Sequence, residues 1–313
     1  MNWHDIARTD LRELSRSKLI WLATAIVAGL CGLGTAVPAL VTDGSDLSYT
    51  LGVETVFITL GTVVPFVALG LGYRVIAGAR ESGTMRFLLG LPNRRLDVVL
   101  GMAVSRVAAT IGVAGIGGVV GLLVLVGLYD STSLGPPLLV VVGLITVGVV
   151  YAVVGVAISA SVDSSTGAVG GAFGAYVVLF FFWERIPQAV YWLVNGSFPS
   201  GDTRPGWFAF LTRLNPGTAI GDLTVARFEW MRNAEYVSVR QTSDLIEGDV
   251  PFYLSEPAGV VVVLIWIVAP IIVGYWSFRN RKRLISFSYC PPGRRTDLES
   301  SRARTGLSYF QPH

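Results

Sequence analysis

The residues with the greatest capacity for polar chemistry are gathered in one stretch, GARESGTMRFLLGLPNRR, residues 78–95. It holds four arginines and one glutamate, whereas the chain of 313 residues is 52% hydrophobic and only 14% charged. Within it, Met85, Leu88 and Leu89 recur at helical spacing, with polar residues on the other face. A proline disfavours helix at the residue before it. The pattern predicts a short amphipathic helix that ends before Pro92, a form that suits docking to a soluble partner.

Histidine and lysine are too scarce and too far apart for most membrane enzymes. The two histidines, His4 and His313, lie at the chain ends. Metalloprotease sites, serine proteases with a histidine base and bis-histidine haem sites within the membrane are therefore excluded. A P-loop ATPase needs a Gly-Lys pair, but Lys18 follows a serine and Lys282 follows an arginine. We expect no catalytic residue, no metal site and no cofactor in this chain.

Six apolar runs provide the elements that must position the charged stretch. Each is long enough to cross a hydrocarbon core of about 30 Å, which takes roughly 20 helical residues. The runs are continuously apolar rather than alternating, and backbone polar groups in lipid must be satisfied within the segment, so helices are expected. The sequence predicts an all-α polytopic membrane protein, a single transmembrane domain over residues 1–313, with spans at about 19–41, 51–73, 107–128, 138–160, 167–183 and 258–278.

Basic residues are distributed unevenly between the two sides of this membrane domain. Eighteen of the 24 lie before the first span, between the second and third, or after the sixth. Because positive charge is retained in the cytoplasm, both termini and the segment 74–106 are predicted to be cytoplasmic, in a cell (plasma) membrane. The segment 184–256 is then extracellular, and its short aromatic stretches predict helices at the surface of the lipid bilayer. The basic tail serves this orientation, so no nucleic-acid partner is expected.

Two charged residues border the predicted spans. Glu54 lies three residues into the second span, close to its outer end. It is either an interfacial carboxylate or a residue of a translocation path. Arg106 borders the third span at its inner end and is expected to reach the lipid headgroups. Because the spans otherwise carry almost no charge, an ion-coupled carrier is disfavoured.

Pairs of glycines four residues apart mark two of the spans. Such spacing lets helices approach closely, either within one bundle or across a dimer of permeases. The pairs considered for helix packing are Gly117 with Gly121 and Gly167 with Gly171.

The stretch ARESGTMRFLLGLPNRRLDVVLG, residues 79–101, resembles the segment between the second and third spans of ABC-2 type transporter permeases. The subgroup is the one that includes permeases of copper-enzyme maturation systems. The shared pattern is a Glu-Ser-Gly-Thr run, a leucine-rich turn, a proline and a basic residue before the next span. Six spans and a long segment between the fifth and sixth agree with it, and LNP at 214–216 is a weaker sign of the same family.

The resemblance implies the permease subunit of an ATP-binding-cassette exporter, coupled to a separate ATP-binding subunit that holds the ATP and Mg. It also implies a homodimer, or a pair with a related permease. In the family, the region that corresponds to residues 79–101 of this sequence docks on the ATP-binding subunit as a coupling helix. Carried over to this sequence, the contact residues are Arg80, Glu81, Ser82, Gly83, Thr84, Arg86, Phe87, Leu91, Pro92 and Arg94.

Other interpretations of the same sequence stay open. The chain could be a stand-alone channel or secondary carrier, or a membrane scaffold without transport activity. The charged stretch could be a helix held at the membrane surface by positive charge alone. A neighbouring gene for a P-loop ATPase would favour the permease.

Overall fold

The computed structural model describes residues 2–41, 49–85, 90, 94–129, 133–201, 203–224, 242–246 and 249–280. The chain divides into two compact units, Met1–Arg279 and Asn280–His313, and every described residue except Asn280 belongs to the first. Within these residues all the regular elements are helices. They are α1 (Trp3–Arg16), α2 (Lys18–Val41), α3 (Tyr49–Gly72), α4 (Val75–Glu81), α6 (Arg95–Leu128), α7 (Gly135–Ser161), α8 (Ser165–Tyr176), the π-helix η1 (Val177–Phe182), α9 (Arg185–Asn195), α10 (Gly206–Arg213), α11 (Pro216–Leu223), the 3-10 helices η3 (Thr242–Leu245) and η4 (Phe252–Leu254), and α13 (Glu256–Asn280).

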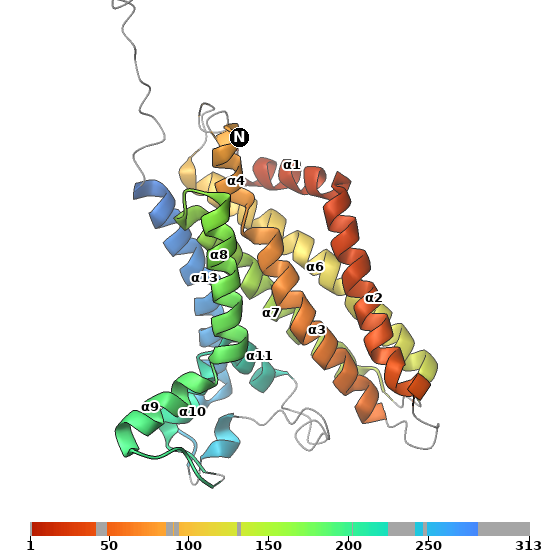
Figure 1. Cartoon of the computed structure of the whole chain (residues 1–313), viewed down its shortest axis with the longest axis vertical. Coiled ribbons are helices and arrows are strands. Elements are labelled where there is room, and N and C mark those ends of the chain that lie inside the picture. Colours follow the sequence, from red (N-terminus) through yellow and green to blue (C-terminus); the bar gives the residue numbers. More distant parts are fainter. Residues whose placement is uncertain are drawn as a thin grey trace, which may run out of the picture. The chain divides into compact units, whose positions relative to one another are not determined.

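Six helical stretches are long and apolar enough to cross a membrane (Figure 1). They are Lys18–Val41, Tyr49–Glu81, Arg95–Leu128, Gly135–Ser161, Ser165–Phe182 and Glu256–Asn280. This confirms the predicted all-α fold with six spans. The third differs most from its prediction, because α6 begins at Arg95 rather than near residue 107. No proline interrupts this extension, and Asp97 lies in its first turn, where the helix dipole favours negative charge.

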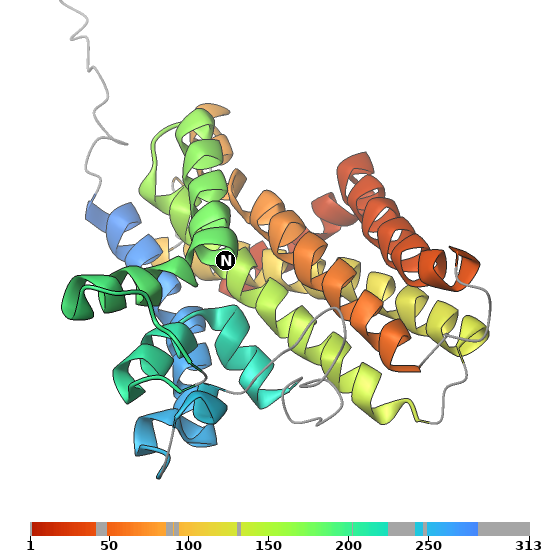
Figure 2. The same ribbon diagram turned by 60° about the horizontal axis from the view of Figure 1, so that its bottom comes forward.

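Helices α2, α3, α6 and α7 pack around a core of buried aliphatic side chains, among them Val27, Leu60 and Leu144. Figures 1 and 2 show these four helices running together. The backbones of α3 and α7 approach closely at Gly72. A Cβ atom there would lie 2.7 Å from the carbonyl oxygen of Ala152. Only glycine fits at that crossing.

Helix α1 lies across α6 at one end of this bundle (Figure 1). Its Ile6 and Ala7 are buried, and a Cβ atom at Gly101 would lie 2.8 Å from the side chain of Ile6. We call the end of the bundle that carries α1 and α4 the α4 end. The opposite end, which carries α9, α10 and α11, is the α11 end. The predicted topology places the α4 end in the cytoplasm.

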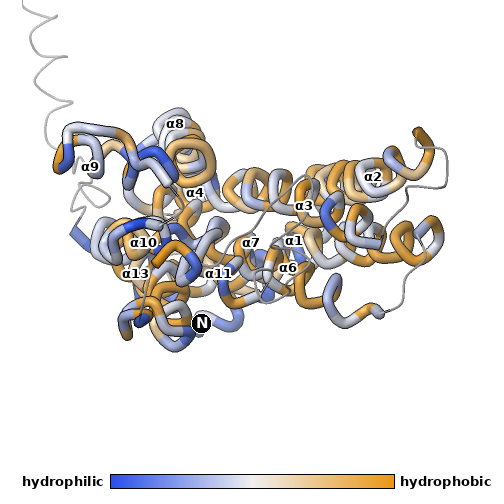
Figure 3. Tube along the Cα trace, turned by 90° about the horizontal axis from the view of Figure 1, so that it is seen from below, coloured by the Kyte–Doolittle hydropathy of each residue, from blue (hydrophilic) through white to orange (hydrophobic). Residues whose placement is uncertain are grey.

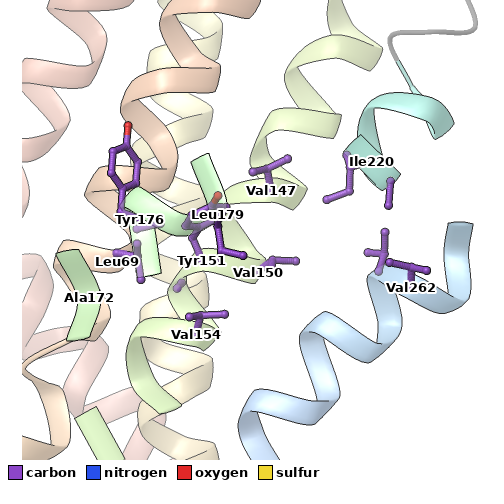
Figure 4. Close-up of a cluster of buried hydrophobic side chains, with 14 residues drawn as sticks. Leu69, Val147, Val150, Tyr151, Val154, Ala172, Tyr176, Leu179, Ile220 and Val262 are labelled. Carbon is purple, nitrogen blue, oxygen red and sulfur yellow. The ribbon is translucent and has the colours of Figure 1, made fainter. Parts of the chain in front are cut away.

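A second core joins α7, α8 and η1 to α11 and α13. In Figure 4, Ile220 of α11 and Val262 of α13 face each other beside Val147 of α7, and Tyr151 and Leu179 lie together nearby. Helix α11 is therefore inserted among the spans. Its burial was not predicted, because eight residues are too few to show a clear apolar period.

Helices α9 and α10 confirm that the two aromatic stretches after the fifth span are short helices. They contact each other through aromatic rings, with the centroids of Tyr191 and Trp207 6.0 Å apart. Figure 3 shows hydrophobic residues along the spans and hydrophilic residues around α9 and α10. The described parts of segment 184–256 thus form short helices at the α11 end of the spans.

Candidate functional site

Two arginines from opposite sides of the predicted coupling region converge on one aromatic ring. Phe278, near the end of α13, is completely buried. The guanidinium carbon of Arg80 in α4 lies 5.2 Å from the centroid of its ring, and that of Arg95 in α6 lies 5.8 Å away. Both distances suit a cation–π contact. The ring therefore links the two helices that border residues 82–94 to the sixth span.

The same arginines satisfy carbonyl groups at the ends of two spans. Arg95 donates from Nη1 to the carbonyl oxygens of Phe278 and Arg279, at 3.2 and 2.9 Å. Arg80 donates from Nη2 to Ala160 at 2.9 Å and from Nη1 to Val162 at 2.5 Å, where α7 ends. The last carbonyls of a helix lack partners within it, so each arginine caps a span as well as contacting the ring.

Glu81 and Ser159 join α4 to the fourth and fifth spans. The carboxylate of Glu81 accepts hydrogen bonds from the backbone N–H and the hydroxyl of Ser165, at 2.6 and 2.5 Å. Ser165 begins α8, so this carboxylate lies where the helix dipole favours negative charge. The hydroxyl oxygen of Ser159 in α7 accepts from the N–H groups of Ile76 and Ala77, both at 3.0 Å. Helix α4 is thereby fixed to α7 and α8.

Gly83 explains the glycine of the Glu-Ser-Gly-Thr run. Its φ angle is +80°, a conformation that glycine adopts without steric cost. Its N–H donates to the carbonyl oxygen of Arg80 at 3.2 Å, which ends α4 in the manner of a glycine C-cap. The hydroxyls of Ser82 and Thr84 then lie 2.9 Å apart. The Glu-Ser-Gly-Thr run therefore ends α4 in a tight turn.

The predicted contact residues thus fall into four groups, and their contact with a partner stays a prediction. Ser82, Gly83 and Thr84 form the turn that ends α4. Arg80 and Glu81 contact α7, α8 and α13 within the chain. Arg94 is exposed and immediately precedes α6. Four of the predicted residues lie outside the described part of the chain: Arg86, Phe87, Leu91 and Pro92.

At the α11 end, Asn215 of the LNP run joins three elements. Its Nδ2 donates to the carbonyl oxygen of Leu179 in η1 at 2.7 Å. Its Oδ1 accepts from the N–H groups of Gly217 and Thr218, at 2.8 and 3.2 Å, which makes it the N-cap of α11. The neighbouring Leu214 carbonyl accepts from the indole N–H of Trp266 in α13 at 2.8 Å. Sequence analysis gave LNP only as a family sign; its Asn-Pro pair is also a helix start signal.

Arg213 and Asp222 form a buried ion pair beside this junction. Arg213 Nε lies 3.4 Å from Asp222 Oδ2, and the two side chains are 4% and 6% exposed. Asp222 also accepts from the N–H and hydroxyl of Thr242, at 3.1 and 2.6 Å, and Arg213 donates to the carbonyl oxygen of Leu254. Burial raises the pKa of Asp222, against the hydrogen bonds from Thr242 and the charge of Arg213. Sequence reasoning missed this pair because its members stand nine residues apart in a charged segment.

A cavity of about 520 Å³ opens beside these groups. It lies between α3 and α7 on one side and η1, α10, α11 and η3 on the other. Its lining is apolar toward the middle of the spans, where Pro65 and Val147 contribute, and more polar around Glu184 and Asp222. A pocket of this size and mixed character is typical of a small-molecule site.

Glu54 and Arg106 are both buried in the structure. Glu54 is 2% exposed and does not line the described cavity, so its role in a translocation path stays a prediction. The expectation that Arg106 reaches the headgroups is wrong. Its Nη2 lies 3.2 Å from Oδ1 of Asp10, and the hydroxyl of Ser105 also donates to Asp10. Helix α1 folds over α6 and covers the guanidinium.

Of the four glycines considered for helix packing, three lie against other helices of the same chain, and two of these leave no room for a side chain. A Cβ atom at Gly117 would lie 2.6 Å from Val27 of α2, and one at Gly171 would lie 2.7 Å from Ile158 of α7. At Gly121 an added Cβ would make ordinary contacts with Val56 of α3 and Thr35 of α2, and Gly167 lies next to the cap of its own helix. A role for these glycines in a permease dimer stays a prediction.

Six spans, a charged segment fixed to several of them and a cavity at the opposite end define a membrane transport component. The chain matches the family described as ABC-2 family transporter protein over residues 4–283. It therefore belongs to that family, as the Glu-Ser-Gly-Thr stretch implies, and it is the membrane permease of an ATP-binding-cassette transporter rather than the ATPase itself. It is 25% identical over 301 residues to the probable ABC transporter permease protein NosY of Stutzerimonas stutzeri, covering 88% of this chain and 98% of that protein.

Proposed function

We propose that this permease forms the path of an exporter driven by a separate ATP-binding subunit, and that residues 82–94 receive the movement of that subunit. The observation that carries the proposal is the anchoring on both sides of these residues. Arg80 and Glu81 fix the preceding helix to α7 and α8, and Arg95 fixes the following helix to α13. A displacement of the segment is thereby transmitted to five of the six spans.

The separate subunit follows from the composition of this chain and from its family. The sequence contains no Gly-Lys pair that could hold ATP phosphates. Family membership implies an ATP-binding partner, and we propose that ATP and Mg are held there. We also propose that two permeases, identical or related, share the path in a cell membrane, with both termini in the cytoplasm as the basic residues favour.

Co-expression tests the coupling proposal. The tagged chain would be produced with an ATP-binding-cassette protein encoded beside it and recovered from solubilised membranes. Arg94→Glu reverses the charge of an exposed residue at the segment and should reduce co-purification strongly, because interfaces are steered by charge complementarity. Arg12→Glu makes the same change at an exposed position of α1 and should leave it unchanged.

Insertion of each variant is checked by its yield and elution in detergent. If Arg94→Glu retains the ATP-binding protein as fully as Arg12→Glu does, the segment is not the contact. If even the wild type recovers no ATP-binding protein, the stand-alone carrier or scaffold replaces the coupled permease. Transport into inverted vesicles that requires ATP would establish export.

A further inference from the structure

The cavity at the α11 end has a hydrogen-bonding character that its residue types alone do not reveal. Several threonines line it, and four of their hydroxyls already donate to the protein. Thr62, Thr212 and Thr224 donate to backbone carbonyls of their own helices, at 2.8, 3.0 and 2.6 Å. Thr242 donates to the carboxylate of Asp222 at 2.6 Å. A hydroxyl whose proton is engaged offers a ligand only its oxygen lone pairs.

The side-chain nitrogens of the described lining also donate within the protein. Trp183 donates its indole N–H to the carbonyl oxygen of Leu211 at 3.1 Å, and Asn215 donates one of its two amide N–H groups to Leu179. The hydroxyls of Tyr151 and Thr218 make no side-chain hydrogen bond within the described chain, and either can donate or accept. The side chains of the described lining therefore present mainly hydrogen-bond acceptors.

The charge of the described lining is negative. It includes the carboxylates of Asp222 and Glu184 and no lysine, arginine or histidine. Asp222 is paired with Arg213, whereas Glu184 is exposed and has no ion pair or hydrogen bond among the described residues. An exposed carboxylate with no ion-pair partner among the described residues thus stands beside aromatic rings, among them Phe180 and Trp183. Carboxylates and aromatic faces both attract organic cations.

We propose that this cavity binds the transported molecule, and that this molecule is an amphipathic organic cation with N–H donors. The inference rests on the proposed function, because a permease needs a site for its substrate. The apolar wall toward mid-membrane accepts the body of such a molecule, and the acceptors and Glu184 receive its positive end. An anionic molecule would meet a like charge and few hydrogen-bond donors.

Two fluorescent aromatic probes of opposite charge test the ligand class. Ethidium is a cation with amino groups, anilinonaphthalene sulfonate is an anion, and both brighten in apolar sites. The full-length permease in nanodiscs of zwitterionic lipid should bind ethidium more tightly than the anion, with empty nanodiscs as background. Glu184→Gln should weaken ethidium binding about two- to fivefold, the range for an exposed ion pair. Glu256→Gln removes an exposed acid outside the lining and should not.

Filling the cavity tests the location. A Cβ atom at Gly61 would meet only Leu144, at 3.6 Å, so Gly61→Leu extends into the cavity and should abolish ethidium binding. Gly70→Leu makes the same change on α3, where nothing lies within 4 Å of an added Cβ, and should bind like the wild type. Equal or tighter binding of the anion overturns the ligand class. Ethidium binding that survives Gly61→Leu overturns the site.

These measurements contain no ATP-binding subunit, so their outcome is independent of the coupling experiment. If ethidium binds selectively but no ATP-binding subunit co-purifies, the proposed ligand site stands and the proposed coupling is wrong. If the ATP-binding subunit co-purifies but ethidium does not bind selectively, the coupled permease stands and the proposed substrate class is wrong.

Discussion

The side-chain amide of Asn215 donates a hydrogen bond to the carbonyl oxygen of Leu179, 2.7 Å away. Leu179 lies in the π-helix η1, where the backbone departs from the i to i+4 pattern. The amide thus donates to a carbonyl oxygen at the helical irregularity and holds α11 against the fifth span. Irregular backbone at membrane depth is tolerated where protein groups satisfy it.

Replacing Asn215 should therefore destabilise the fold from two sides. Asn215→Ala removes both the N-cap of α11 and the donor to Leu179, and we expect a loss of about 2–4 kcal/mol in the free energy of unfolding. Asn215→Asp keeps the capping oxygen and loses the donor, so it should still melt below the wild type. Thermal unfolding in detergent measures both. Equal stability of Asn215→Asp and wild type would show that the contact with Leu179 contributes little.

Gly259 of α13 leaves space for the buried guanidinium of Arg213. A Cβ atom at Gly259 would lie 2.6 Å from Nη2 of Arg213, which is held by Asp222 and Leu254 and cannot move away freely. Gly259→Ala should cost about 1–3 kcal/mol of stability through overpacking. Gly70→Ala lies in open space and should be neutral or stabilising, because alanine favours helix. Chemical denaturation of the two variants measures the difference in stability. If Gly259→Ala is as stable as Gly70→Ala, the guanidinium of Arg213 can move to make room.

The sequence predicts the spans because one physical constraint acts locally. A bilayer requires about 20 continuous apolar residues, and that requirement is visible without knowledge of any partner. The short helices α9 and α10 are likewise expected from their aromatic stretches. The helix stop at Gly83 is not, because the apolar spacing of Met85 and the leucines after it favours a continuous helix up to Pro92, whereas α4 ends at Glu81. The start of α6 at Arg95 agrees with a new helix expected after Pro92 that leads into the third span. Hydropathy alone places that span later, because the first turns of α6 carry charged residues such as Arg95 and Asp97.

The pairing of charged side chains could not be predicted in the same way. Arg106 meets Asp10, which lies 96 positions away, only because α1 folds back over α6. A lone arginine at the end of a span more commonly reaches the headgroups. Phe278 likewise gives no signal, since aromatic residues are common at the ends of spans. The sites that depend on tertiary contact were therefore missed or misassigned.

The buried pair of Arg106 and Asp10 makes the docking of α1 sensitive to single substitutions. Asp10→Leu leaves the guanidinium buried without its partner and should cost about 3–5 kcal/mol of stability. The double variant Asp10→Leu, Arg106→Met removes both charges and should recover much of that loss. Unfolding of the two variants in detergent gives the comparison. A double variant no more stable than Asp10→Leu would mean that α1 is held mainly by Ile6 and its neighbours.

The ring of Phe278 should matter more for transmitting movement from residues 82–94 to the spans than for binding the ATP-binding subunit. Phe278→Met keeps most of the volume but removes the face that Arg80 and Arg95 contact, and each exposed or partly exposed cation–π contact is worth about 0.5–1 kcal/mol. If the proposed coupling holds, this variant should retain the ATP-binding subunit while ATP-driven transport falls severalfold.

Phe252→Met makes the same change at an exposed ring at the α11 end and should leave both readouts unchanged. The ratio of transport to ATP hydrolysis in proteoliposomes separates the possibilities. A residue that transmits movement should change the ratio of transport to ATP hydrolysis without changing how much ATP-binding subunit is bound. If co-purification falls as much as transport does, Phe278 instead stabilises the surface on which that subunit docks.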